Sequence, residues 1–300
     1  MTAIRVFLAS CCLLFAFFVV QDKYMQTTIA ADPKYPREVA QWQEVSVPPE
    51  TDRDAHRVWL YAANYSDKTW RVFVERDRIC AQLTTEPSER QQERPKFTPK
   101  TDRFTDASIF AHVDDGWLVA FNEGEFGAAL YWFSLDGKHS YEVSHHQVVD
   151  FFVLPDGRLY AIEGLSHMAI DEGSIIKITR SEPTGRWQAS TVTRLPGAPY
   201  AISVRRDGTM FVVLSDALVS ISARYEINTL LLPNAPWGSG GLYPDSSVLS
   251  PDEQKLYIGM RQFVGEFDIA TKKLRLLIPS DAFLNKLSRE DERRIRQYGD

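Results

Sequence analysis

The feature that most constrains the fold is a phrase of short β-rich runs that recurs along most of the chain. In its clearest copy, an apolar run at 148–154 is followed by the turn Asp156-Gly157, a second run at 159–162 and a loop that ends at Gly173. A third run at 175–179, a polar turn and a fourth run at 187–195 complete the copy. Each copy therefore predicts four short strands joined by turns.

The first turn of the phrase recurs at a regular interval. It stands at Asp115-Gly116, Asp156-Gly157, Asp207-Gly208 and Asp252-Glu253, at spacings of 41, 51 and 45 residues. Four-stranded propeller blades repeat every 40 to 50 residues or so. A sheet of short strands that is apolar on both faces must be covered by its neighbours. The chain thus resembles β-propellers in general, with no more specific family indicated, and we expect an all-β fold.

We predict five blades, with four or six as alternatives. A further copy upstream can be read as a strand at 57–63, a strand at 69–75, the turn 76–78 and a strand at 79–83. The stretch 42–47 either supplies the innermost strand of that copy or pairs with the last blade and closes the ring. No amphipathic helix is expected before the last twenty residues.

The composition along the chain predicts four regions. Residues 1–31 form a signal peptide or membrane anchor, 32–51 a lead-in, 52–280 the propeller and 281–300 a helical extension. In that extension Asp281 is placed to cap a helix at 282–287. Ser288 and Asp291 then have the spacing of a capping box, which predicts a short C-terminal helix.

The N-terminus predicts delivery outside the cytoplasm, to the periplasm or the exterior. Arg5 precedes an apolar run at 6–20, and the small residues Ala30 and Ala31 follow, which is the order of a signal peptide. An uncleaved anchor is the alternative, although a spanning helix needs about 20 apolar residues. A lipobox ending at Cys11 is a third interpretation, but this cysteine lies inside the apolar run. The membrane is therefore expected as a partner only through this segment.

Charge and cysteine content exclude several classes of function. The net charge is −6, and no basic run with interleaved aromatic residues is present, so we expect no nucleic-acid partner. Beyond residue 12 the only cysteine is Cys80, which rules out an internal disulfide and a cysteine-based zinc site in the exported part. No catalytic motif with a fixed spacing is present.

Functional side chains are expected on one rim of the propeller. In this strand order, the loops between second and third strands share a rim with the connections between blades. The longest of these loops are 122–127 and 163–172. The candidate binding residues on this rim are Glu123, Glu125, Phe126, Glu163, His167, Tyr200, Trp237 and Arg261.

The chemistry of these candidates leaves alternatives open. The carboxylates and His167 are the groups that acid-base catalysis or metal binding needs, yet polar residues on loops are usually only solvated. Trp237, beside glycine-rich sequence, either closes over a ligand or packs between blades. The neighbours His145 and His146 point to opposite faces if they lie on a strand, so we assign no metal site and no cofactor.

Two functional hypotheses follow. The first is a non-catalytic extracytoplasmic protein that binds a protein partner with the loop rim, for example an immunity protein that covers a toxin's active site. The second is an enzyme that works in the central channel, either a calcium-dependent hydrolase or lactonase or a cyclase similar to the glutaminyl cyclases. Calcium is the cofactor that the hydrolase or lactonase form of the second hypothesis requires, and we expect no other cofactor. A structural factor of the cell envelope is a third class, and it depends on retention of the anchor.

Overall fold

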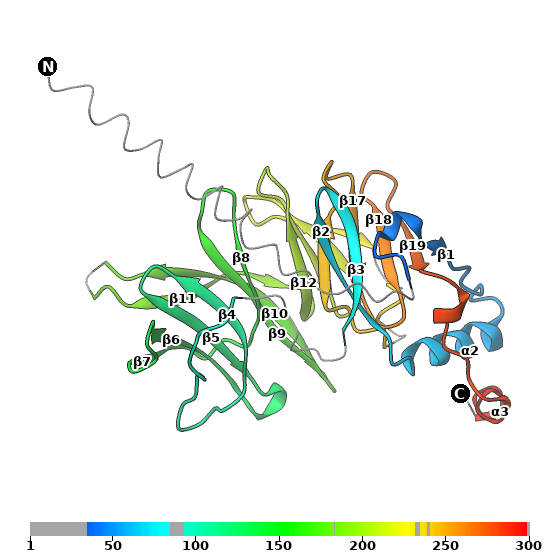
Figure 1. Cartoon of the computed structure of the whole chain (residues 1–300), viewed down its shortest axis with the longest axis horizontal. Helices are drawn as coiled ribbons and strands as arrows, with labels where there is room; N and C mark the ends of the chain where they lie inside the picture. The colour runs from blue at the N-terminus through cyan, green and yellow to red at the C-terminus, as the bar shows by residue number, and fades with distance from the viewer. Residues whose placement is uncertain (1–34, 85–92, 183, 232–234, 239–240, 299–300) are drawn as a thin grey trace, which may run out of the picture. The chain divides into compact units, whose positions relative to one another are not determined.

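The computed structural model describes residues 35–84, 93–182, 184–231, 235–238 and 241–298. The chain divides into Met1–Tyr35 and Pro36–Asp300, and the fold given below is that of the second unit. Its described residues form antiparallel β-sheets with two short helices, which confirms the all-β class. Figure 1 shows the four larger sheets following one another in chain order, with the two helices near the C-terminal sheet.

Four sheets contain the repeated four-strand phrase, and their strands pair in chain order. The first sheet contains β4 (Ala107–Val113), β5 (Gly116–Asn122), β6 (Ala128–Ser134) and β7 (Ser140–Ser144); the second contains β8 (Val148–Val153), β9 (Leu159–His167), β10 (Ile170–Arg180) and β11 (Trp187–Leu195). The third contains β12 (Pro199–Val204), β13 (Met210–Leu214), β14 (Leu218–Ile221) and β15 (Ile227–Leu231); the fourth contains β16 (Ser246–Leu249), β17 (Lys255–Gly259), β18 (Val264–Asp268) and β19 (Lys273–Ile278).

The repeated aspartates shape the first turns. The carboxylates of Asp156, Asp207 and Asp252 each accept a hydrogen bond from the backbone N–H two residues later. Gly157 and Gly208 have φ values of 84° and 85°, the left-handed region that glycine adopts without steric cost. The first copy differs, because its turn is 114–115 and Gly116 already belongs to β5. There a Cβ would stand 2.1 Å from Phe133 O, so glycine is needed for close packing.

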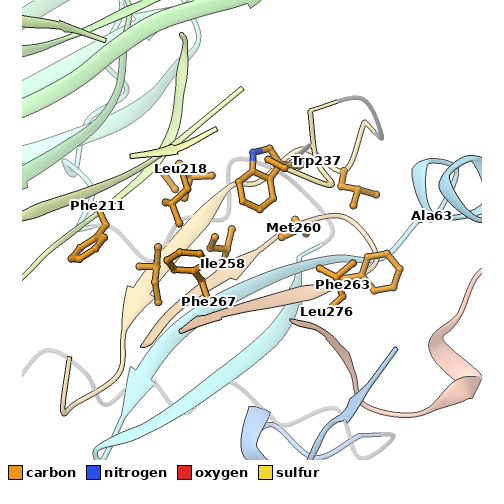
Figure 2. Packing of buried hydrophobic residues seen from close by; sticks show 14 of the residues in the cluster. Ala63, Phe211, Leu218, Trp237, Ile258, Met260, Phe263, Phe267 and Leu276 are labelled. Atoms are coloured by element: carbon orange, nitrogen blue, oxygen red, sulfur yellow. The ribbon is translucent and has the colours of Figure 1, made fainter. Parts of the chain in front are cut away.

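Successive sheets cover each other's apolar faces. The first strands of neighbouring sheets pack in the series β4, β8, β12, β16 and then β2. One cluster joins the first and second sheets and includes Leu118 and Ile176; another joins the second and third and includes Ile162 and Val212. Figure 2 shows the cluster that joins the third and fourth sheets around Phe211, Ile258 and Phe267. Burial of apolar area stabilises a fold by about 25 cal/mol per Å². Much of that burial takes place here between neighbouring sheets.

The upstream copy at 57–83 departs from the prediction. Residues 57–63, which we expected as a strand, belong to helix α2 (Arg53–Asn64), and only β2 (Thr69–Glu75) and β3 (Arg78–Thr84) remain. The helix begins where Asp52 accepts a hydrogen bond from Ala55 N. Its Trp59 stacks on Phe263 at a ring-centroid distance of 5.2 Å. A helical face that packs on the fourth sheet thus outweighs the β-branched and aromatic content of the segment.

The lead-in pairs with the last sheet. After the short helix η1 (Val39–Gln41), strand β1 (Gln43–Glu44) pairs antiparallel with β19, placing Gln43 opposite Ile278. Of the two alternatives for this stretch, the structure has the closing strand. Residues 1–34, including the apolar run 6–20, lie outside the described residues. Within the described part of the chain, neither α2 nor the C-terminal helix combines the length and the apolarity that a membrane span requires.

The C-terminal extension contains less helix before residue 288 than we expected. Asp281 begins the single 3-10 turn η3 (Asp281–Phe283), after which the backbone is extended, so the predicted helix at 282–287 is wrong. The predicted cap at Ser288 is present, because Asp291 N donates to Ser288 Oγ at 3.0 Å, but the Asp291 carboxylate accepts from the Ser288 hydroxyl and not from its backbone N–H. Helix α3 (Arg289–Tyr298) follows and packs against α2.

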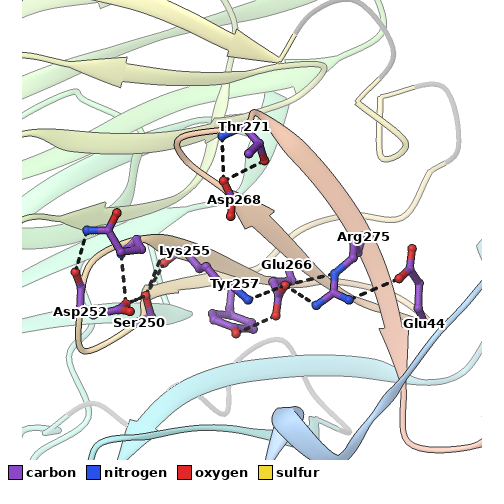
Figure 3. Close-up of polar contacts among 10 residues, drawn as sticks. Glu44, Ser250, Asp252, Lys255, Tyr257, Glu266, Asp268, Thr271 and Arg275 are labelled. Carbon is purple, nitrogen blue, oxygen red and sulfur yellow. Dashed lines mark hydrogen bonds and ion pairs between the residues drawn. The ribbon is translucent and has the colours of Figure 1, made fainter.

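A buried carboxylate ties together the strands of the last sheet. Glu266 on β18 is 7% exposed and accepts hydrogen bonds from Tyr257 at 2.8 Å, Lys255 at 3.0 Å and Arg275 at 2.5 Å. Figure 3 shows how Arg275 extends the network to Glu44 on β1. Burial alone would raise the pKa of Glu266, but the hydrogen bonds from these three side chains outweigh burial and hold the pKa below its usual value.

We expect Glu266→Gln to lower the free energy of unfolding by about 2 kcal/mol at neutral pH, because it leaves two cations without their shared carboxylate. Since the folded pKa of Glu266 is lowered, its contribution is complete above the ordinary value of 4.5 and is lost as the pH falls through the folded pKa. Urea unfolding from pH 7 to pH 3 should therefore show the difference between the two proteins shrinking. Glu182→Gln, at an exposed position, is the control, and an equal effect there would contradict the prediction.

Candidate binding surface at the loop rim

The connections at one end of the sheets form a continuous surface, called the loop rim below. It comprises the second-to-third connections 122–127, 163–172, 215–217 and 260–263, the blade connections 145–147 and 196–198, and the described residues of 235–245. Hydrogen bonds join neighbouring connections: Gly164 N donates to Gln147 O at 3.0 Å, and Arg261 N donates to Leu242 O at 2.6 Å. The rim is therefore one supported surface rather than a set of separate loops.

The first long loop is fixed by a polar side chain from the next sheet. Residues 124–126 form the 3-10 turn η2 (Gly124–Phe126), and Asn122 Oδ1 accepts from Gly124 N at 3.1 Å. Gln147, in the connection before β8, donates through Nε2 to Asn122 Oδ1 at 2.8 Å and to Gly124 O at 3.2 Å. Loop 122–127 is thus attached to the following sheet at its base.

The second long connection is a hairpin rather than the loop that we expected. Strands β9 and β10 continue to pair out to His167 opposite Ile170, so Glu163 lies within β9, opposite Ser174. Gly164 and Gly173 face each other in this extension. A Cβ on Gly164 would come within 2.3 Å of Glu172 O and 2.8 Å of Pro199, so two glycines permit the hairpin to press against the start of β12.

Asp171 connects this hairpin to the third sheet. Its carboxylate accepts from Ala198 N at 2.9 Å and from Ser215 Oγ at 2.8 Å. Ser215 N in turn donates to Ala198 O at 2.8 Å. From the sequence we expected Asp171 only as part of the loop 163–172, without a role of its own. Its position in sequence carries no signal for this contact, because the partners are 27 and 44 residues away.

The tips of the two long connections meet. Glu125 Oε2 lies 2.9 Å from His167 Nε2, which brings two predicted candidates together as an ion pair when the imidazole is protonated. Beside them stand three exposed apolar side chains, which we call the tip patch: Phe126 at 77% exposure, Met168 at 93% and Ile170 at 43%. Met168 and Ile170 were not among the predicted residues. The sequence did contain a signal for these two residues, because both are apolar and stand at a hairpin turn, where polar residues are usual.

Met168 occupies an unfavourable backbone conformation. It is the first residue of the two-residue turn between β9 and β10 and has a φ of 51°. A side chain in this left-handed region costs roughly 1 kcal/mol, and hairpin turns of this kind favour glycine, asparagine or aspartate there. The side chain of Met168 is 93% exposed, so packing within the chain does not offset this cost.

The remaining predicted residues occupy different surroundings. Glu123 is exposed beside η2, and Glu163 accepts a hydrogen bond from Ser174 Oγ. Burial raises the pKa of Tyr200, while a hydrogen bond with Ser166 acts in the opposite direction. Tyr200 and Ser166 thus join the start of β12 to the hairpin.

Trp237 and Arg261 are engaged in packing. The indole of Trp237 is 2% exposed and donates to Leu214 O at 2.9 Å, which corresponds to the alternative that it packs between blades. Arg261 donates through Nη1 to Asn64 O at 2.6 Å and lies 4.7 Å from the ring centroid of Tyr243. It therefore fastens the end of α2 to the rim and leaves one face of Tyr243 exposed.

The two neighbouring histidines do not share a site. His145 pairs with Glu142 at 2.9 Å, whereas His146 contacts Ser144 and Thr191. Within the residues that the structure describes, no group of three or more histidine, cysteine, aspartate or glutamate side chains is arranged to hold a metal ion.

Comparison with known proteins yields only remote similarity. No protein-family model and no curated protein matches the chain. Among solved structures, an inactive virginiamycin B lyase from Staphylococcus aureus with quinupristin is 20% identical, with a TM-score of 0.42 over 61% of this chain and 59% of the lyase. A gluconolactonase from Xanthomonas campestris is 12% identical, with a TM-score of 0.39 over 60% of each chain.

A third similar structure is the extracellular domain of a putative hybrid two-component system from B. thetaiotaomicron. It is 12% identical, with a TM-score of 0.43 over 80% of this chain and 29% of that one. This chain thus spans less than two thirds of the length of all three proteins. The similarity is too remote to carry a functional argument, and the description of the fold rests on the strand pairing itself.

We expect Met168→Gly to raise the free energy of unfolding by about 1 kcal/mol, because glycine adopts the left-handed region without strain. Met168→Ala removes nearly the same side chain but keeps the strain, so its stability should stay close to that of the parent. Urea denaturation of the three proteins tests this. Equal stability of the glycine and alanine variants would show that the turn is not strained.

Proposed function

We propose that this chain is a five-bladed β-propeller that acts outside the cytoplasm as a non-catalytic binding protein and holds a protein partner on its loop rim. The four complete sheets and the β2–β3 hairpin would be the blades. The first strands pack in the series β4, β8, β12, β16 and β2, which supports five successive units. An immunity protein that covers a toxin's active site is one concrete form of this function.

The observation that carries the proposal is the tip patch. Single exposed apolar residues are common on protein surfaces, but Phe126 and Met168 stand on two separate connections that the Glu125 and His167 side chains bring together. Strain at Met168 adds a cost that packing within the chain does not repay, because its side chain is 93% exposed. Aromatic residues and methionine are enriched where proteins bind each other.

The charge around the tip patch supports a partner with a basic surface. Glu123 and Glu172 are exposed close to it, and Asp216 is exposed on the next connection. Opposite charge on a partner would speed association and fix its orientation. A binding surface with an apolar centre and a charged margin has the usual organisation of a protein interface.

Location outside the cytoplasm rests on the N-terminal sequence alone. The apolar run 6–20, preceded by Arg5, supports export by a signal peptide or an anchor. Mass spectrometry of the N-terminus of the mature protein distinguishes cleavage near Ala30 or Ala31 from retention. A protein that starts at Met1 and is found in the cytoplasm would exclude the proposed location.

Capture of the partner tests the proposed function. The full chain, and its Phe126→Ser/Met168→Gly double variant, are cross-linked to an envelope fraction of the source cells. The double variant should lose the captured partner by at least about tenfold, because it removes the apolar centre without disturbing the core. Leu135→Ser is the matched control, since Leu135 is 58% exposed at the opposite end of β6. Equal loss with the control, or no loss with either variant, would contradict a rim-based interface.

The alternative is a propeller enzyme that works in the central channel with calcium. Asp171, a carboxylate on the rim, is already held by Ala198 N and Ser215 Oγ, which makes it a structural group in this arrangement. Melting curves in calcium and in EDTA separate the two functions. The binding protein should melt at the same temperature in both, whereas a calcium site would raise the melting temperature in calcium.

A further inference from the structure

A second site lies at the opposite end of the sheets from the loop rim. A pocket of about 420 Å³ is bounded by the first strands of the third and fourth sheets and by β2. Its wall includes Ile202, Ser203 and Val204 from β12, Ser247, Val248 and Leu249 from β16, and Val74 from β2. Arg206, Pro251 and Glu253 from the adjoining turns stand at its mouth. This volume is in the range of ligand sites.

Main-chain groups of three strands point to this pocket. Arg205 N donates to Thr209 O, and hydrogen-bonded residues alternate along an antiparallel pair, so Ser203 also bonds to β13. The N–H and C=O groups of Ile202 and Val204 therefore point away from β13. In β16, Ser250 N donates to Lys255 O, which by the same reasoning directs the groups of Ser247 and Leu249 away from β17. All four of these residues line the pocket.

The edge of β2 follows the same rule. Trp70 N donates to Met260 O and Val72 N to Ser246 Oγ, so the even-numbered residues of β2 present their N–H groups to the fourth sheet. Val74 is the next of them and lines the pocket. Within the described residues, β12 and β16 each pair with a strand on one side only, whereas β2 also bridges to the fourth sheet through Thr69 and Arg261. Two unpaired strand edges and the end of β2 thus face one space.

The chemistry of this wall specifies its ligand. Donors and acceptors recur along each edge at every second residue, about 7 Å apart, which is the repeat of an extended peptide backbone. Between them stand the apolar side chains of Val74, Val204 and Leu249, together with the hydroxyls of Ser203 and Ser247, which lie 2.9 Å apart. Such a wall offers main-chain pairing with pockets for small or β-branched side chains.

We propose that this pocket binds a short extended peptide segment that pairs through its backbone with the inner edge of β12 or β16. The peptide carries small or β-branched apolar side chains. Its backbone N–H groups donate to the carbonyls of the strand edge, and its carbonyls accept from the N–H groups of that edge. The site is separate from the loop rim and does not depend on the function proposed there.

The ligand test uses two blocked hexapeptides of alternating serine and valine, one ordinary and one N-methylated at every backbone nitrogen. In calorimetric titrations of the full chain at peptide concentrations up to the order of 1 mM, the ordinary peptide should bind at least about tenfold more tightly than the methylated one. N-methylation removes backbone donors and leaves the side chains unchanged. Equal binding of both, or binding of neither, would overturn the proposal.

The protein test uses position 204, whose N–H points into the pocket. Val204→Pro removes that donor without removing a hydrogen bond to β13, and should weaken binding of the ordinary peptide by at least about tenfold. Val204→Ala keeps the N–H and should bind within about threefold of the parent. A proline variant that binds as well as the parent would overturn the proposal.

A further variant covers the case in which Val204→Pro does not fold. Val74→Trp fills the pocket from β2 and should abolish peptide binding, while Phe126→Ser on the loop rim should leave it unchanged. If the rim variant weakened peptide binding as much as Val74→Trp, the peptide would be bound at the rim, and the proposed pocket would be wrong.

Discussion

The structure depends on the mutual covering of sheets that are apolar on both faces. Within the described residues, each four-stranded sheet buries at least one face against a neighbouring sheet, while Phe104 covers part of the first sheet and α2 packs on the fourth. The residues that do this are inward-facing members of short strands, such as Ile162 and Val212, which are fully buried between the second and third sheets. The stability of each sheet is therefore coupled to that of its neighbours. The loops contribute little to this burial, so their lengths and sequences can differ from sheet to sheet.

Because stability comes mainly from the strands, the connections can be variable at one end of the sheets and uniform at the other. At the rim, the second-to-third connections range from a long paired hairpin to the three residues 215–217. At the other end, the turns are short and alike, and aspartates with the same local hydrogen bond recur in three of them. Variation at the rim is the pattern expected when the connections of that end meet a partner, whereas the repeated turns at the other end share one local structure.

The sequence predicted the parts of the fold that depend on local chemistry. Aspartate and glycine in the turns, apolar strands and the Ser288 cap all act within a few residues, so they can be read directly. The helix α2 was missed because residues such as Val58 and Tyr61 have strand-like character, and only packing of Trp59 on Phe263 decides the matter. In the same way, the burial of Trp237 and the role of Asp171 depend on partners from other sheets, to which a single sequence gives no guide.

The pairing of β1 with β19 has a consequence for assembly. Gln43 and Ile278 are adjacent in the sheet but belong to opposite ends of the chain, so this contact closes a loop that contains nearly the whole protein. Such a contact forms only after both segments have been made, and closing so large a loop carries an entropic cost. A chain without β1 would expose the end of β19 as an unpaired strand edge, which is a site for pairing with other molecules. The two-residue strand thus covers Leu277 and Ile278 at that edge in the folded protein.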